Sequence, residues 1–132
     1  MENIYQEIVD QIKRMIPEKW VSVYLYAEKW ADYDTVYFYY YPEDDHKARL
    51  HYEITEQFQI EPAEFDHLED ELRDTIILLY EKQMRQEAET WTSMTFILKN
   101  TGDFQIEYGY QNLSHLGPVE KRKFWKEKYS IN

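Results

Sequence analysis

The chain has 132 residues, no cysteine, and 26 acidic against 15 basic residues, which gives a formal net charge of −11. This length is enough to bury a hydrophobic core, so we expect one domain over residues 1–132. The lack of cysteine excludes disulfides and thiolate metal sites and suits a reducing cytosol. Residues 1–15 mix charged with apolar side chains, unlike a signal peptide or a membrane span, so we expect a cytoplasmic protein without membrane contact.

The negative charge is unevenly distributed along the chain. Residues 1–116 hold 10 basic and 24 acidic residues, a net charge of −14, whereas residues 117–132 hold 5 and 2, a net charge of +3. A body of this charge repels nucleic-acid phosphates and attracts a basic protein, so we expect no direct nucleic-acid binding. Plain solubility is the alternative explanation of the charge.

In the first half of the chain, the spacing of apolar residues changes from the period of a helix to the two-residue period of a strand. Apolar residues from Ile4 to Ile16 recur at helical spacing and predict a helix over about residues 3–16, which Pro17 ends. From Trp20 onward, apolar and polar or tyrosine residues alternate, which is typical of strands. The elements expected next are a strand over 20–28, a hairpin loop over 31–34, a strand over 36–41, a turn over 42–45 and a third strand over 49–54.

The second half begins with a long helical pattern. Pro62 suits the first helical position, and a stripe of apolar residues from Phe65 to Gln83 or Met84 predicts a helix that reaches about residue 88. The elements expected after it are a strand over 91–98, a turn over 100–103 and a strand over 104–110. A short basic segment with Val119, Phe124, Trp125 and Tyr129 follows Gly117-Pro118, and we expect it to form a C-terminal helix that docks through its aromatic residues.

This order predicts an α+β fold with an antiparallel sheet of about five strands and helices packed mainly on one face, in the order α-β-β-β-α-β-β-α. The expected helix-covered face consists of Val21, Val23, Leu25, Val36, Phe38, Leu50, Tyr52, Phe96, Leu98, Phe104 and Ile106. The opposite face is expected to present Tyr24, Tyr26, Tyr37, Tyr39, Tyr41, Trp91 and Ile97 to solvent or to a partner.

The chain carries few signs of catalysis. It has no glycine-rich phosphate loop, no Gly-x-Ser-x-Gly elbow, no His-Glu-x-x-His and no cysteine nucleophile. Its four histidines lie on different predicted elements, and the acidic turn at 43–45 lacks the further oxygen ligands that a calcium loop supplies. We therefore expect no enzyme activity, no metal and no cofactor.

The tyrosine-rich sheet face is the strongest candidate site. Tyrosine and tryptophan provide rigid contact area with a polar tip and are enriched at binding hot spots. Three other interpretations stay open: the C-terminal segment folds over this face and completes the core, two copies bury the face against each other as a homodimer, or the face forms the pocket of a small ligand-binding domain or enzyme. Aromatic rings combined with carboxylates also suggest an acidic decoy for a nuclease.

Short motifs follow one another from end to end of the chain: Met15-Ile16-Pro17 with Trp20, Val23–Glu28, Val36–Tyr40, Trp91, Thr101–Phe104, Tyr108–Tyr110 and Arg122–Trp125. In this order and spacing they resemble the YezG-like immunity proteins of Bacillus-type bacteria. The resemblance implies an antitoxin without catalytic residues. Its expected partner is the toxic C-terminal domain, commonly a nuclease, of a secreted LXG-type polymorphic toxin.

The chain departs from that family's pattern at Asp103, Gly109, Gln111 and Asn112, so the resemblance transfers neither the identity of the toxin nor the epitope. The acidic surface is expected to steer a basic toxin, and the aromatic residues are expected to supply affinity. The toxin-binding candidates are Tyr24, Tyr26, Tyr37, Tyr39, Tyr41, Trp91, Glu43, Asp44 and Asp45.

Overall fold

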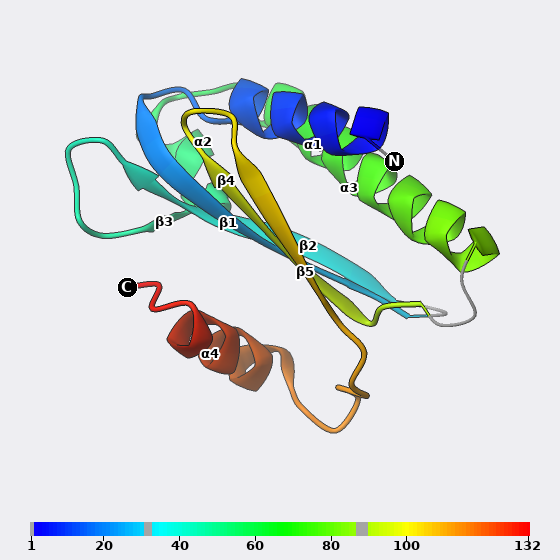
Figure 1. Ribbon diagram of the computed structural model, residues 1–132. Helices are drawn as coiled ribbons and strands as arrows, with labels where there is room; N and C mark the ends of the chain where they lie inside the picture. Colours follow the sequence, from blue (N-terminus) through cyan, green and yellow to red (C-terminus); the bar gives the residue numbers. More distant parts are fainter. Residues whose placement is uncertain (1, 31–32, 87–89) are drawn as a thin grey trace.

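The computed structural model describes residues 2–30, 33–86 and 90–132 (Figure 1). The first two residues of the predicted 31–34 loop, and the last two expected in the long helix, lie outside these ranges. The helical elements are α1 (Glu2–Met15), the 3₁₀ helix η1 (His51–Glu53), α2 (Ile54–Gln57), α3 (Pro62–Gln86) and α4 (Pro118–Lys128). The strands are β1 (Trp20–Lys29), β2 (Asp34–Pro42), β3 (Arg49–Leu50), β4 (Ser93–Lys99) and β5 (Phe104–Gly109).

The strands form one antiparallel sheet in the order β3-β2-β1-β4-β5, with β1 at its centre. This architecture confirms the predicted α+β fold and its five-stranded sheet. None of the helices in the described ranges combines the length and the apolar content needed to cross a membrane.

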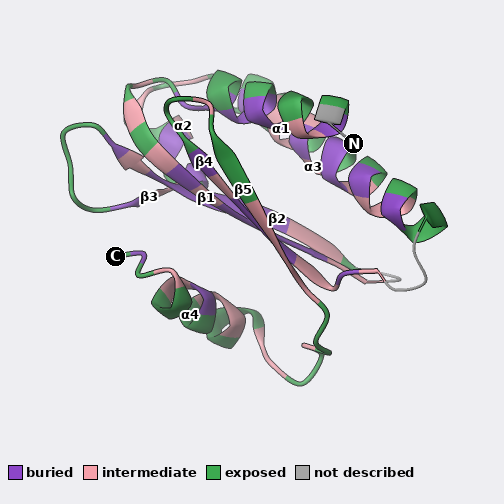
Figure 2. Cartoon of the chain, in the orientation of Figure 1, coloured by how far each residue is buried: buried purple, intermediate pink, exposed green. Residues whose placement is uncertain are grey.

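The sheet lies between two helical layers. Helices α1 and α3 cover one face, and α4 lies against the other (Figure 1). Figure 2 shows that the buried residues concentrate between these layers, while the outer surfaces of the helices are exposed. The larger core, on the α1 and α3 side, includes Ile8, Ile12, Leu25, Phe38, Leu72, Ile76, Leu79, Phe96 and Leu98.

The first strand starts with an irregularity that changes one predicted face. The register with β2 shifts between Trp20 and Ser22, so Val21 has no partner there and is 45% exposed. The sequence pattern placed Val21 in the core with Val23 and Leu25, which is wrong because a bulge reverses the alternation locally. Trp20 packs against the larger core instead.

The third strand is much shorter than predicted. β3 ends at Leu50, and residues 51–57 continue as η1 and α2. Leu50 packs on the α4 side of the sheet, and Tyr52 is 48% exposed, so both were wrongly placed on the helix-covered face. Ile54 reaches the larger core from α2. An alternating pattern of only six residues, 49–54, does not distinguish a strand from a short helical turn, because both structures bury some of the apolar residues.

The long helix α3 follows its predicted stripe. Phe65, Leu72 and Leu79 are buried, and at the end of the stripe Gln83 is buried while Met84 is 52% exposed. Helix α4 starts with Pro118 at its first position, and Gly117 is its N-cap. This helix brings the only strongly basic segment of the chain to the sheet face opposite α1 and α3 (Figure 1).

Candidate protein-binding surface

The predicted aromatic face exists, but α4 covers it. Cross-strand register pairs Tyr24 with Tyr39 and Tyr26 with Tyr37 on adjacent strands. Tyr26, Tyr37 and Tyr39 are only 5–7% exposed, and Tyr24 and Tyr41 are half-buried. The expectation that this face is open to a partner is therefore wrong, and the alternative in which the C-terminal segment completes the core is confirmed.

Trp125 of α4 is the centre of this second core. Its ring lies 5.5 Å from that of Tyr26, 5.6 Å from that of Tyr37 and 6.2 Å from that of Tyr39. Its Nε1 donates a hydrogen bond of 3.0 Å to Thr95 Oγ1 on β4. The aromatic face is thus filled rather than concave. Phe124, predicted to dock as well, is 52% exposed.

Cations of α4 reinforce the contact with the tyrosine rings. The Arg122 guanidinium lies 4.5 Å from the ring centre of Tyr37, and Lys126 Nζ lies 4.7 Å from that of Tyr39. Burial raises the pKa of the Tyr37 hydroxyl, and the Arg122 charge opposes that rise only in part. A basic helix over neutral tyrosines is a favourable cation–π arrangement.

A buried ion pair fixes the start of α4. Glu28, whose side chain is fully buried, accepts hydrogen bonds from Tyr26 Oη (2.6 Å) and Trp30 Nε1 (2.7 Å). Lys121 Nζ donates to the same carboxylate at 2.9 Å. Burial raises the pKa of Tyr26, and the hydrogen bond to Glu28 raises it further. Three donors satisfy the carboxylate, so its burial is compatible with a stable fold.

The residues that follow α4 are hydrogen-bonded to β5 on one side of the sheet and to β2 on the other. Tyr129 Oη donates to Glu107 Oε1 at 2.8 Å, and the Asn132 N–H donates to Tyr41 Oη at 3.2 Å. The Ala48 N–H donates to the Asn132 carbonyl at 3.1 Å. Beside this helix, a cleft of about 270 Å³ opens between β4, β5 and α4.

Trp91 lies apart from the aromatic face. Its side chain is 2% exposed and belongs to the larger core, where its Nε1 donates to Gln83 Oε1 at 2.6 Å. Its ring stacks on Tyr108 at 5.9 Å. The prediction that Trp91 lies on the aromatic face was wrong. The alternation of β4 does not extend to Trp91, because the strand begins only at Ser93.

The acidic turn is exposed and lies within a longer acidic segment. Glu43, Asp44 and Asp45 are all exposed. Residues 43–74 hold 12 acidic and 3 basic residues, a net charge of −9, which is most of the −11 of the chain. Figure 1 places the loop after β2, helix α2 and the beginning of α3 at the same end of the sheet. We call the exposed carboxylates there the acidic end: Glu43, Asp44, Asp45, Glu53, Glu56, Glu61, Glu64 and Asp66.

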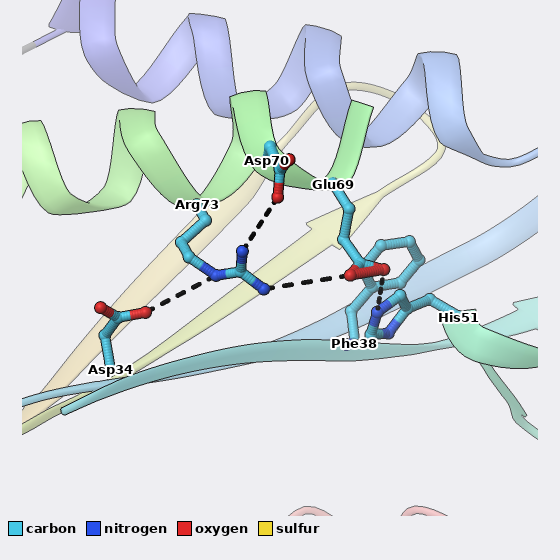
Figure 3. A network of polar contacts seen from close by, with 6 residues as sticks. All are labelled: Asp34, Phe38, His51, Glu69, Asp70 and Arg73. Carbon is cyan, nitrogen blue, oxygen red and sulfur yellow. Dashed lines mark hydrogen bonds and ion pairs between the residues drawn. The ribbon is translucent and has the colours of Figure 1, made fainter. Parts of the chain in front are cut away.

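Sequence reasoning missed a buried histidine next to this end. His51 is 1% exposed, stacks on Phe38 at 4.9 Å, and accepts a hydrogen bond from the Phe38 N–H at its Nδ1 (3.1 Å). Since Nδ1 is an acceptor, Nε2 carries the proton, and it faces Glu69 Oε2 at 3.3 Å (Figure 3). The even spacing of His51 with Arg49 and Glu53 suggested a solvent-facing strand and gave no sign of this role.

Arg73 extends the same network along α3. Its guanidinium lies 3.0 Å from Asp70, 3.6 Å from Asp34 and 3.9 Å from Glu69 (Figure 3). The network thus joins α3 to the edge of β2. Among the residues that the structure describes, no group of three or more His, Cys, Asp or Glu side chains is placed to hold a metal ion.

The chain is similar to proteins of one family along nearly its whole length. The family described as "Immunity protein YezG-like" matches residues 1–130. Immunity protein YezG of Bacillus spizizenii is 35% identical over 127 residues, which cover 95% of this chain and 79% of that protein. Immunity protein YezG of Bacillus subtilis is 28% identical over 130 residues, covering 97% and 86%. The type VII secretion system protein EsaG of Staphylococcus aureus is 26% identical over 128 residues, covering 96% and 78%. The chain therefore belongs to the YezG-like immunity protein family.

Proposed function

We propose that this protein is a cytoplasmic immunity protein that binds the toxic C-terminal domain of a cognate secreted toxin and neutralises it by stoichiometric binding, without catalysis. The toxin in this proposal is of the LXG type, and its toxic domain is a nuclease. Family membership supports the immunity role. The name of the staphylococcal relative refers to type VII secretion, which agrees with a partner that is exported.

The observation that carries the proposal is the concentration of charge at the acidic end. A nuclease must attract nucleic-acid phosphates, so its substrate surface is basic. A segment with a net charge of −9 attracts such a surface and accelerates the encounter. We therefore infer that the acidic end contacts the basic surface of the toxin domain, with Glu43, Asp44 and Asp45 as its most projecting candidates.

The aromatic residues have a supporting role in this proposal. Tyr26, Tyr37 and Tyr39 are covered by Trp125 within the same chain, so they reach a partner only if α4 leaves the sheet. We propose instead that this second core holds the sheet rigid, while the exposed carboxylates provide the contact.

The test is to mix the purified protein with the cognate toxin domain and to measure the mass of the complex together with nuclease activity. We expect a 1:1 complex, complete inhibition at equimolar ratio, and binding that weakens as salt is raised. An unrelated nuclease of similar net charge is the control, and it should remain active. Absence of a complex, or equal inhibition of the control, would contradict the proposal.

A further inference from the structure

The two edges of the sheet differ in how they are closed. At the β2 edge, β3 pairs with Tyr39 and Tyr40, and the next outward N–H, that of Phe38, donates to His51 Nδ1 at 3.1 Å. A side chain thus occupies the place of a further strand. Proteins commonly protect sheet edges in such ways, because an open edge pairs with other chains.

The β5 edge has no such closure. Lys99 N donates to the Asp103 carbonyl and Thr92 N to the Gly109 carbonyl, both at 2.8 Å, so the odd-numbered residues of this strand face β4. By alternation, the N–H and C=O groups of Phe104, Ile106 and Tyr108 point to the open edge. In the described part of the chain the sheet ends at β5, and residues 104–109 contain neither lysine nor proline to discourage pairing.

We propose that β5 pairs with β5 of a second copy of this chain, antiparallel, about a two-fold axis that passes through Ile106. In this register Ile106 lies opposite Ile106 of the second copy, and Phe104 lies opposite Tyr108. The backbone N–H and C=O groups of all three residues point to the open edge, so each opposed pair exchanges two backbone hydrogen bonds. The two sheets then join into one.

The side chains favour this register. Phe104, which is 40% exposed, gains an aromatic partner in Tyr108, and Gln105 lies opposite Glu107 as a hydrogen-bonding pair. Shifting the axis by one residue toward Gln105 places Asp103 opposite Glu107. Shifting it toward Glu107 places two Glu107 carboxylates opposite each other. Both neighbouring registers therefore oppose like charges, and of these three registers the one centred on Ile106 avoids this.

The interface is small, so the dimer should be weak. It consists of one six-residue strand from each copy and the side chains beside it. Interfaces of this size bind transiently, and we expect a dissociation constant of roughly 1–100 μM. The aromatic face takes no part, because α4 already covers it in each copy.

Sedimentation over a concentration series tests the proposal. Gln105 is exposed, so its substitution should leave the fold intact. Gln105→Lys puts a cation opposite Glu107 and should tighten the dimer, whereas Gln105→Glu puts two carboxylates opposite each other and should weaken it. Each change acts twice across the two-fold axis, and we expect shifts of roughly 2- to 30-fold in the dissociation constant.

Two further variants test the edge and the register. Ile106→Pro removes an outward N–H without touching the bonds to β4, and it should abolish the dimer while circular dichroism shows an intact fold. Because the chain has no cysteine, a mixture of Gln105→Cys and Glu107→Cys chains should form a disulfide between copies, and either variant alone should not.

Three results would overturn the inference. One is a monomer at every concentration up to about 1 mM. Another is a dimer whose dissociation constant is the same in both Gln105 variants. The third is a monomeric protein in which Ile106→Pro loses binding to the toxin domain, since the edge would then serve the toxin rather than a second copy.

Discussion

Trp125 should be the largest single contributor to the attachment of α4. It is 6% exposed and contacts three tyrosine rings of the sheet, the ring of Tyr129, and Thr95. Replacing a buried tryptophan with alanine typically costs about 3–5 kcal/mol. Unfolding entropy of about 2.1 cal/mol/K per residue gives about 0.28 kcal/mol/K for 132 residues. Trp125→Ala should therefore lower the melting temperature by roughly 10–18 °C.

Thermal unfolding followed by circular dichroism measures this effect, and the neighbouring Phe124 provides the matched control. Phe124 is 52% exposed on the same helix, so Phe124→Ala should lower the melting temperature by only a few degrees, on the order of one third of the Trp125→Ala effect or less. Dye binding should increase in Trp125→Ala, because Tyr26, Tyr37 and Tyr39 lose their cover. Equal effects of the two substitutions would refute the conclusion that Trp125 closes the second core.

Further substitutions test the buried polar groups. Lys121→Met leaves the Glu28 carboxylate buried without its cation and should destabilise the fold by roughly 3 kcal/mol in urea unfolding. Adding Glu28→Gln to this variant should recover part of the lost stability, and no recovery would argue against the ion pair. His51→Ala leaves the Phe38 N–H without its acceptor and should cost at least about 1–3 kcal/mol, whereas His67→Ala on the exposed surface should cost little; equal losses would exclude the edge-closing role. Burial raises the pKa of Tyr26 above its ordinary value of 10.0. The unfolded chain therefore releases this proton first, and above about pH 10 the residue's contribution to stability falls by about 1.4 kcal/mol per pH unit. The decline in urea-unfolding stability between about pH 9 and 11 should be shallower in Tyr26→Phe, and an unchanged slope would contradict the assignment.

The sequence pattern predicted the elements of this fold well where the same spacing of apolar residues was repeated over many residues. The stripe of α3 from Phe65 to Gln83 and the alternation of β1 and β2 led to the correct helix and strands. Alternation also placed five of the six tyrosines of β1 and β2 on a common face, as their register confirms. Periodicity reports which side chains share a face, because that depends only on local geometry.

What covers a face depends on contacts between distant segments, so the sequence left open whether the C-terminal segment or a partner covers the tyrosine face. Trp125 and Tyr26 are far apart in the chain, and no local pattern pairs them. The basic charge of residues 117–132 was a usable signal, because cations of α4 lie over tyrosine rings of the sheet. His51 had no such signal: its role depends on the single outward N–H of Phe38, which only the sheet topology reveals.

The association rate constant of the toxin domain with charge-reversed protein tests the proposed binding surface most directly. The first variant reverses three charges of the acidic end: Glu43→Lys/Asp44→Lys/Asp45→Lys. The second variant is the control and makes the same change in net charge at exposed positions elsewhere: Glu7→Lys/Glu120→Lys/Glu127→Lys. We predict that the first variant associates at least about tenfold more slowly at low salt than the second. Equal rates for the two variants would contradict the assignment of the acidic end as the surface that meets the toxin.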